Sequence, residues 1–536
     1  MSSSLQNNRD AFDKWMNQIN KNRVINCGKS VAEYPFASCR IRRICGLNSF
    51  KELPNDVLER MTKPTGTKGS VVYWMNRDQR VQDNWALLFA QRIGIKFSLP
   101  LAICFSLPSS AAIQTRRHAN FLLEGLAEVE QECNELNIGF HIIFETGAPK
   151  PRTGEKRKAD CEPSSNGIAD RKHAPLINFL KKMEARVVIT DFSPLRDDLH
   201  FLETIKDRLP QDIPFYQVDA HNVIPVWFVS DKVEYAARTI RPKLHEKAKE
   251  LFTDFPPIVS HPYAKQTEPV DWSRIKEFLT DRVTETVEAV EKYKGGAKAG
   301  FFQLYTFLHA RLPTYEKDRN DPTKDSLSNL SPWLHFGHIS PQRCLWEAEF
   351  LQKQHKASVD AFIEEAFIRR ELADNFCFYN KHYDSLKGAW SWAQETLRKH
   401  SNDIRQPSYS EEKMESASTG DELWNAAQRQ LLWEGKMHGF LRMYWAKKIL
   451  EWHAGGPEKA LKLGIYLNDK YSLDGTDPNG YVGVMWSICG IHDQGWMERP
   501  VFGKIRFMNF TGCKRKFDVA AFIKKYPPPI NKHFKA

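Results

Sequence analysis

The sequence predicts two folded units, an α/β unit with a parallel sheet followed by a unit made of helices. The chain has 536 residues, which is more than one ordinary domain contains. Short apolar runs rich in β-branched residues alternate with helical segments up to residue 229, and helical spacing dominates from Trp272 onward. We therefore expect a Rossmann-like α/β domain in the first half and an all-α domain in the second.

Residues 1–67 are expected to form an N-terminal arm. They are polar, prolines at positions 35, 54 and 64 interrupt them, and no helical or strand period persists along them.

The α/β domain is expected over residues 68–230. Its strands are expected in the runs VVYWMN, LPLAICFSL, IGFHIIFE, RVVITDF and FYQVDAHNVIPVWFV. Helical segments at 83–91, 116–136 and 174–184 separate these runs, which predicts helices on both faces of a parallel sheet. Neither GxGxxG nor a P-loop motif occurs, so the glycine-rich loops that bind nucleotide phosphates are missing.

Residues 147–173 are rich in Pro, Gly, Ser and charge, and we expect a disordered insertion there. Basic residues at 156–158 and 171–172 have the spacing of a bipartite nuclear import signal. An ordinary charged loop explains them equally well. The import-signal interpretation of 147–173 favours a nuclear location for the protein.

Residues 231–296 are expected to be a linker that contains helices, because helical patterns at 231–252 and 273–294 flank a proline-rich stretch. The helical domain is expected over 297–536. Its helical segments are expected at 297–312, 341–356, 358–378, 421–453 and 457–468.

The composition narrows the class of partner. Lys and Arg number 77 against 66 Asp and Glu, a net charge of +11, which favours a polyanionic partner. The ten cysteines are scattered without a CxxC pair, which is typical of reduced thiols and not of a disulfide framework or a metal site. Apolar runs are far shorter than the ~20 residues of a membrane span, so we expect an intracellular protein without membrane contact. The 15 Trp and 33 Phe suggest a flat ligand.

A first candidate site lies in SLSNLSPWLHFGHISPQRC, residues 326–344. Ser, Asn and Gly crowd this loop before a helix that starts at Ser340-Pro341. Such a loop can hold an anion such as a pyrophosphate, or can simply be a capped loop.

A second candidate lies in the helical stretch 423–453. Trp445 and Trp452 are two turns apart and share a face, separated by ~10 Å. Trp424 is positioned to pack against them near Gly435 or Gly439. Three indoles in a row form either a core or an electron relay. Arg442 in the same stretch needs a fixed anion, which Asp474 could supply.

Three other segments carry candidate residues. In 362–380 most charges should be solvated, and one of Glu364 and Glu365 turned inward would have a raised pKa. In 467–496 Asp-Gly and Asp-Pro-Asn-Gly predict turns, and Trp486 is placed to line a cavity mouth. Residues 501–536 carry nine basic residues and one acid among aromatics, which favours nucleic acid over a solvated helix face.

Six ordered motifs together resemble the photolyase/cryptochrome family, and specifically class II cyclobutane pyrimidine dimer (CPD) photolyases. They are YEKDRNDP, SNLSPWLHFGHISP, EEAFIRRELADNF, KMHGFLRMYWAKKILEW, LDGTDPNGY and GCKRKFD. The resemblance extends from about Gly69 to Tyr526. It implies an α/β antenna domain and a helical domain that holds a folded FAD.

The resemblance also implies site residues. Those implied for the FAD phosphates and ribityl chain are Tyr315, Leu327, Ser328, Asn329, Leu330 and Ser331. Those implied at the flavin ring are Arg442, Asp474, Gly475 and Asn468, the last facing N5. Those implied for the dimer and its DNA are Glu365, Trp486, Asp493, Gln494, Arg506, Lys514 and Arg515. The relay implied for flavin reduction is Trp445, Trp424 and Trp452.

The activity implied is light-driven repair of pyrimidine dimers in DNA by electron transfer from excited reduced FAD to a flipped-out dimer. A cryptochrome-like photoreceptor without repair activity is the main alternative. A (6-4) photolyase would need active-site histidines, and His438 and His492 are the nearest candidates, although a structural role is favoured for both. A second antenna chromophore, a deazaflavin or a folate, is left open, and a monomer is expected. Gln494 stands where the family usually has Arg, which should weaken one phosphate contact.

Overall fold

The computed structural model describes residues 2–32, 34–44, 69–107, 115–144, 174–210, 213–264, 267–283 and 287–528. The chain forms two compact units, and each is described by itself. Unit 1 comprises Met1–Ile113, Gly125–Pro225 and Thr253–Phe278, and unit 2 comprises Gln114–Glu124, Val226–Phe252 and Leu279–Ala536. The units therefore interleave along the chain, whereas the sequence predicts an α/β domain that ends at residue 230, a linker over 231–296 and a helical domain from residue 297.

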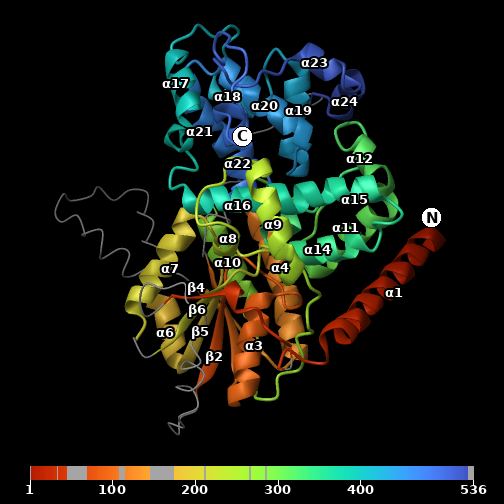
Figure 1. Ribbon diagram of the computed structural model, residues 1–536, viewed down its shortest axis with the longest axis vertical. Helices are drawn as coiled ribbons and strands as arrows, with labels where there is room; N and C mark the ends of the chain where they lie inside the picture. Colours follow the sequence, from red (N-terminus) through yellow and green to blue (C-terminus); the bar gives the residue numbers. More distant parts are fainter. Residues whose placement is uncertain are drawn as a thin grey trace, which may run out of the picture. The chain divides into compact units, whose positions relative to one another are not determined.

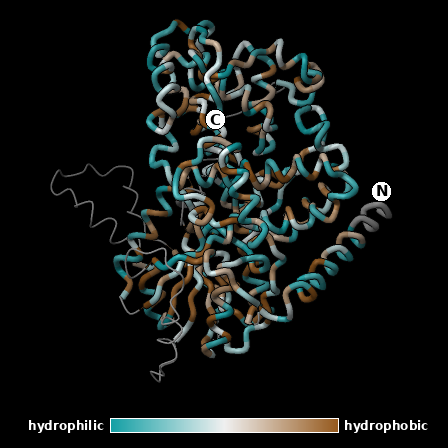
Figure 2. Tube along the Cα trace, in the orientation of Figure 1, coloured by the Kyte–Doolittle hydropathy of each residue, from teal (hydrophilic) through white to brown (hydrophobic). Residues whose placement is uncertain are grey.

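Unit 1 is built on a six-stranded sheet with the strand order β1-β6-β5-β2-β3-β4 (Figure 1). The strands are β1 (Ile41–Arg43), β2 (Ser70–Met75), β3 (Leu101–Leu107), β4 (Gly139–Phe144), β5 (Ala185–Asp191) and β6 (Phe215–Val218). β1 is antiparallel to β6, and the other neighbouring strands are parallel. Figure 2 shows hydrophobic residues along these strands, as expected for a sheet that is buried on both faces. The predicted parallel sheet is confirmed.

Helices cover both faces of this sheet. Leu176 and Phe201, from the helices that follow β4 and β5, cluster with Phe215 of β6. Phe89, from the helix that follows β2, contacts the next residue, Tyr216, with ring centroids 5.7 Å apart. Successive residues of a strand point to opposite faces, so the helices lie on opposite sides (Figure 1). These helices are α3 (Trp85–Phe97), α6 (Ala174–Lys182) and α7 (Arg196–Arg208).

The N-terminal region contains two elements that the sequence analysis does not expect, the helix α1 (Ser2–Cys27) and the edge strand β1. The buried face of α1 is narrow and includes Phe12, Ile19 and Arg23, of which Arg23 pairs with Asp83 at 2.8 Å. Because α1 has few apolar residues among many polar ones, its sequence shows no clear helical period. Residues 45–68 lie outside the described residues.

The predicted insertion at 147–173 also lies outside the described residues, so its disorder and its import signal stay predictions. The last apolar run, 215–229, is not one strand. β6 ends at Val218, because the Asp219 side chain accepts the backbone N–H groups of His221 and Asn222 and turns the chain.

Unit 2 consists of helices. Its main helices are α9 (Ala237–Leu251), α11 (Ala297–Thr306), α12 (Tyr315–Asp318), α13 (Ser331–His335), α14 (Pro341–Glu349), α15 (Lys356–Ile363), α16 (Arg370–Tyr379), α17 (Ser391–Lys399), α18 (Glu411–Glu415), α19 (Glu422–Glu434), α20 (Gly439–Trp452), α21 (Gly456–Tyr471), α22 (Pro478–Cys489), α23 (Phe510–Lys514) and α24 (Val519–Lys525). Two helices, α4 (Arg116–Glu135) and α10 (Trp272–Arg282), are divided between the units. No helix in the described ranges is both long and apolar enough to cross a bilayer.

Several helical segments differ from the prediction. The expected helix 273–294 ends at Arg282, and the expected helix 341–356 ends at Glu349. The expected segment 421–453 is two helices, α19 and α20, because Gly435 adopts a left-handed φ of 63° that ends α19. The segment 358–378 contains a π-helical stretch, η4 (Glu364–Arg369), between α15 and α16. α22 forms where turns are expected, because Asp477 accepts the Asn479 N–H at 2.8 Å and Pro478 occupies the first turn.

Candidate active site

The central feature of unit 2 is an ion pair between a buried aspartate and a partly buried arginine. Arg442 of α20 donates from Nη2 to Oδ1 of Asp474 at 3.4 Å, which confirms the predicted pairing. The Ser472 hydroxyl also donates to Asp474. Burial opposes ionisation of Asp474, but the charges of Arg442 and Lys436 outweigh it and hold its pKa well below the usual range. Asp474 is therefore a fixed anion.

Lys436 is a member of this site that the sequence analysis does not single out. It lies between α19 and α20, and its Nζ donates to Oγ of Ser331 at 2.5 Å. Its charge also acts on Asp474. Lys436 thus links the loop expected to hold phosphates with the anion expected beside the flavin. Its position one residue after Gly435, where α19 ends, is the only signal in the sequence.

The loop before α13 contains the residues expected to hold FAD phosphates. Leu330 is buried, Asn329 is left-handed with a φ of 55°, and the Ser328 carbonyl accepts from Gln303 at 2.6 Å. A pocket joins Leu327 and Asn329 of this loop to four lysines and two acids, Asp325 and Glu434, so that its lining has an excess of positive charge, which favours an anion such as a pyrophosphate. The lysines are Lys292, Lys324, Lys436 and Lys525. Further along, Ser340 caps α14 through the Arg343 N–H, so the capped-loop interpretation is correct there.

Asn468 and Gly475 lie close to the ion pair in the chain, and neighbouring residues fix both. The Asn468 amide donates to Oδ1 of Asp469 at 3.0 Å. A Cβ at Gly480 would lie 2.8 Å from the Asn468 amide nitrogen, and a Cβ at Gly475 would lie 2.7 Å from the Asp469 carbonyl oxygen. Glycine is required at position 475, because the backbone of Asp469 approaches it closely, whereas the close neighbour of Gly480 is the Asn468 side chain. Tyr315 is buried on α12, and burial raises its pKa to about 12.

The three candidate relay tryptophans contact one another. Trp424 of α19 lies nearly parallel to Trp445 of α20, with centroids 6.4 Å apart and planes 9° apart. Its other neighbour is Trp452, 5.7 Å away and nearly perpendicular. The Trp424 indole N–H donates to the Trp445 carbonyl oxygen, and the Trp445 N–H donates to Gln428. Trp424 therefore lies between the other two, in the order 445–424–452.

The acidic stretch of η4 differs from the prediction. Glu364 pairs with Arg241 and Arg369, both at 2.9 Å; burial opposes its ionisation, but these guanidiniums outweigh it and lower its pKa. Glu365 is exposed and pairs with Arg319 at 2.7 Å. Glu364, whose pKa is lowered, is therefore not an inward carboxylate of the kind whose pKa would rise, and Glu365 is exposed.

The prediction that most charges of 362–380 are solvated is also wrong. The polar residues of α16 lie inside unit 2. The buried ones are Arg370, Glu371, Asp374 and Asn375. Asn375 accepts the Glu234 N–H at 2.8 Å and donates to the Lys232 carbonyl, so it joins α16 to the segment before α9.

The candidate residues for the dimer and the DNA backbone lie on α22 and in the segments that follow it. Trp486 is half-buried on α22, and Asp493 in the next loop lies 4.0 Å from Arg506. Gln494 is exposed beside Asp493. Lys514 and Arg515 are exposed at the end of α23.

The two histidines considered for (6-4) chemistry have structural surroundings. His438 caps α20 by accepting the Phe440 N–H, and burial, aided by Lys436, lowers its pKa to about 4. Burial lowers the pKa of His492 to about 3, and its ring contacts Phe376. Both are neutral near pH 7, which favours the structural role.

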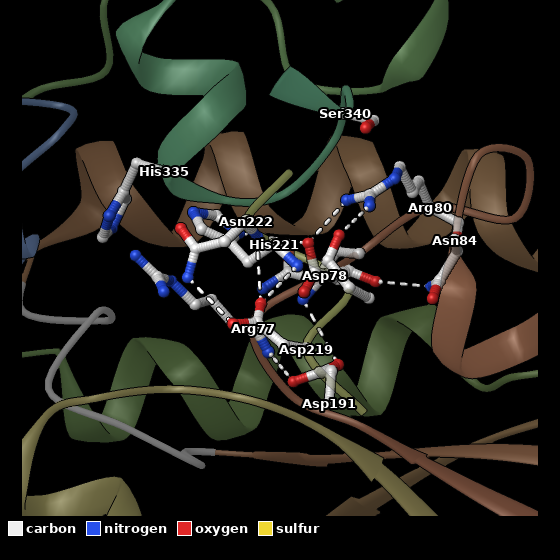
Figure 3. Close-up of polar contacts among 12 residues, drawn as sticks. Arg77, Asp78, Arg80, Asn84, Asp191, Asp219, His221, Asn222, His335 and Ser340 are labelled. Carbon is white, nitrogen blue, oxygen red and sulfur yellow. Dashed lines mark hydrogen bonds and ion pairs between the residues drawn. The ribbon is translucent and has the colours of Figure 1, made fainter. Parts of the chain in front are cut away.

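In unit 1, polar groups gather where β2 and β5 end (Figure 3). The strand order reverses between these strands, where α/β sheets commonly bind phosphates. Here the backbone N–H groups of residues 76–78 and the Tyr73 hydroxyl donate to the Asp191 carboxylate. Asp78 pairs with Arg80 at 2.6 Å and with His221 at 3.1 Å. The Asp191 carboxylate thus accepts the hydrogen bonds that a bound phosphate accepts in other α/β sheets. The sequence likewise has no glycine-rich phosphate motif.

The chain is similar to known proteins along most of its length. The family model described as DNA photolyase matches residues 71–261. A deoxyribodipyrimidine photo-lyase of Potorous tridactylus is 52% identical over 85% of this chain and 81% of its own length. A protein of the same name from Oryza sativa is 46% identical over 87% and 89%.

Solved structures share the fold. A class III photolyase from Agrobacterium tumefaciens has a TM-score of 0.63 at 17% identity, covering 87% of this chain and 88% of its own. A Synechocystis cryptochrome has a TM-score of 0.61 at 16% identity, covering 85% and 88%. Fold similarity alone does not separate photolyases from cryptochromes, but the sequence relatives do. The chain belongs to the DNA photolyase family.

Proposed function

We propose that this chain is a deoxyribodipyrimidine photo-lyase that uses light to split cyclobutane pyrimidine dimers in DNA. The observation that carries this function is its 44–52% identity, over at least 85% of the chain, to three proteins of that name. The cryptochrome alternative has only a shared fold at 16% identity in its favour.

FAD is the cofactor that the family implies, and the donor set in unit 2 fits it. The fixed pair Arg442–Asp474 offers a cation and an anion to the flavin ring, with Asn468 nearby in the chain. The lysine-lined pocket at Leu327 and Asn329 offers positive charge to a pyrophosphate. Reduced FAD would supply, on absorbing light, the electron transfer that opens the cyclobutane ring. A second chromophore, a deazaflavin or a folate, stays a prediction.

Trp486 and Glu365 are the residues we assign to the dimer. A half-exposed indole offers a flat surface to a dimer flipped out of the duplex, and flipping is easier for a dimer because its stacking is already weakened. Glu365 accepts from Arg319 at 2.7 Å, and 46% of its side chain is exposed, so its carboxyl group is accessible to a thymine. Hydrogen bonds from fixed groups stabilise charge that develops during the reaction.

Trp445, Trp424 and Trp452 are assigned to electron supply. The ring centroid of Trp424 lies 6.4 Å from that of Trp445 and 5.7 Å from that of Trp452. The three indoles therefore form a continuous row along which an electron can pass. The row begins three residues after Arg442 on α20, at the side chain of Trp445.

The DNA backbone is assigned to the exposed basic residues that follow α22. They are Arg506, Lys514 and Arg515, with Asp493 and the uncharged Gln494 beside them. Nuclear localisation and a monomeric state stay predictions from the sequence.

The function is tested with purified, FAD-loaded protein and an oligonucleotide that contains one thymine dimer. Blue or near-UV light should restore intact thymines, and an identical sample kept in darkness should restore none. A loaded protein that restores no thymines in light would overturn the proposed function in favour of a photoreceptor.

A further inference from the structure

Lys447 is a buried lysine to which the proposed mechanism gives no role. It lies on α20, and its side chain is 0% exposed. Its Nζ lies 5.1 Å from the ring centroid of Trp486 and donates to the Ser487 carbonyl oxygen at 2.9 Å. A cation within about 6 Å of an indole face is attracted by the π-electrons of the ring. Lys447 thus holds α20 against α22 at the indole assigned to the dimer.

The charge of Lys447 is not compensated by a carboxylate, whereas the charge of the neighbouring Lys448 is. Lys448 pairs with Glu451 at 2.6 Å. Among the residues that the structure describes, no carboxylate lies within 4.0 Å of the Lys447 ammonium, and the nearby Asp493 pairs with Arg506. Taking an ammonium out of water without a carboxylate costs free energy. A residue kept at such a cost beside a candidate site is a candidate for function.

The groups around Lys447 make its protonation depend on pH near pH 7. Burial lowers its pKa to about 7; Asp493 and Cys489 act in the opposite direction, and Arg506 acts in the same direction. DNA phosphates near Arg506 and Asp493 would favour the charged form, because a negative charge nearby stabilises an ammonium.

We propose that Lys447 is a positioning residue that holds the Trp486 indole for stacking and, through its positive charge on that ring, increases the preference for dimer-containing DNA over undamaged DNA. This inference rests on the proposed function, because it assumes that Trp486 contacts the dimer. It adds a residue that acts through Trp486 and does not itself touch the bases.

The test is Lys447→Met, which keeps a long side chain and removes the charge. Dissociation constants are measured in darkness for two duplexes that differ only in one thymine dimer. We expect the preference for the dimer duplex to fall about tenfold, as loss of a desolvated cation–π contact implies, with affinity for undamaged DNA unchanged. In the parent protein the preference should also fall as pH rises through about 7, because the ammonium loses its proton, whereas the variant should show no such pH dependence.

Lys448→Met is the matched control. Lys448 is on the same helix and nearly as buried, but its charge is compensated, so its loss should leave the dimer preference unchanged. Thermal unfolding of both variants separates structure from recognition. Lys447→Met loses the hydrogen bond to the Ser487 carbonyl but also removes a buried charge, so the two effects oppose each other and the midpoint should change little.

Two results would overturn the inference. One is a Lys447→Met protein that keeps the full dimer preference. The other is equal loss of both affinities together with a lower unfolding midpoint, which indicates a structural role only. If the parent protein itself shows no dimer preference and no repair in light, the proposed function fails first, and that outcome is distinct from the failure of Lys447 alone.

Discussion

At the scale of single residues, Asp474 organises the charges of unit 2. Two cations, Arg442 and Lys436, act on it, and the Ser472 hydroxyl donates to it. The Arg442–Asp474 pair was predictable from sequence, because a guanidinium in an apolar helix needs an anion. Lys436 was not predictable, since its position depends on how α19 ends. The pairing of Glu364 with Arg241 and Arg369 was not predictable either, since it depends on tertiary contacts and on the π-helical register of η4.

Asp474→Asn removes the anion and leaves two cations without compensation. We expect a loss of about 3 kcal/mol in the free energy of unfolding, because breaking a buried pair leaves an unpaired charge. FAD retention after purification should also fall. Chemical denaturation and flavin absorbance check the two effects. Asp360→Asn, which removes an exposed partner of Lys356, is the control and should change neither.

The same carboxylate predicts a pH dependence. Its pKa in the folded chain lies below the ~3.9 of an unfolded aspartate, so its stabilising contribution is complete above about pH 4 and is lost as pH falls toward the folded pKa. The stability difference between the parent protein and Asp474→Asn should therefore narrow in acid. Unfolding curves from about pH 6 to pH 3 measure it, and a constant difference would contradict the assignment.

At the scale of elements, the packing of α19 on α20 sets the order of the indoles. A single helix over 421–453 would place Trp424 about six turns before Trp445. The left-handed Gly435 instead folds α19 back, so that Trp424 lies between Trp445 and Trp452. The helical pattern indicated which residues share a face, but the break depends on a glycine conformation that spacing does not reveal.

Trp424→Phe tests this arrangement. The smaller ring interrupts the row and loses the hydrogen bond to the Trp445 carbonyl, at a cost of about 1–3 kcal/mol. Light-driven reduction of oxidised flavin with an external reductant should be almost abolished, while repair by chemically reduced protein should persist. Trp433→Phe changes an exposed indole, 40% accessible, on the same helix and should photoreduce normally. Normal photoreduction by Trp424→Phe would remove the relay assignment.

At the scale of the whole molecule, the net charge of +11 and the two-unit organisation were both predictable from sequence. Their details were not. Residues 114–124 belong to unit 2 and residues 253–278 to unit 1, and both assignments depend on tertiary packing. The apolar face of α1 is too narrow to show a helical period. The polar residues of α16 look like a solvated surface in the sequence, yet they are buried because α16 packs inside unit 2.

The basic residues after α22 predict a salt dependence. Changing Lys514, Arg515 and Lys516 together to Gln should lower the slope of log affinity against log salt by about 2 to 3, if each contacts a phosphate. The same change at Lys181 and Lys182, basic residues of unit 1 at the end of α6, should have less effect. Titrations of a dimer duplex at several salt concentrations measure the slopes, and equal slopes for the two variants would place the DNA elsewhere.

The most direct test of light-driven dimer repair compares two lesions under single flashes of light. Photoreduced protein is mixed with a duplex that carries either a cyclobutane thymine dimer or a (6-4) photoproduct, and intact thymines are counted after each flash and in darkness. We expect loss of the cyclobutane dimer with each flash, none in darkness, and no change in the (6-4) lesion. Repair in darkness, repair of the (6-4) lesion only, or no repair at all would contradict it.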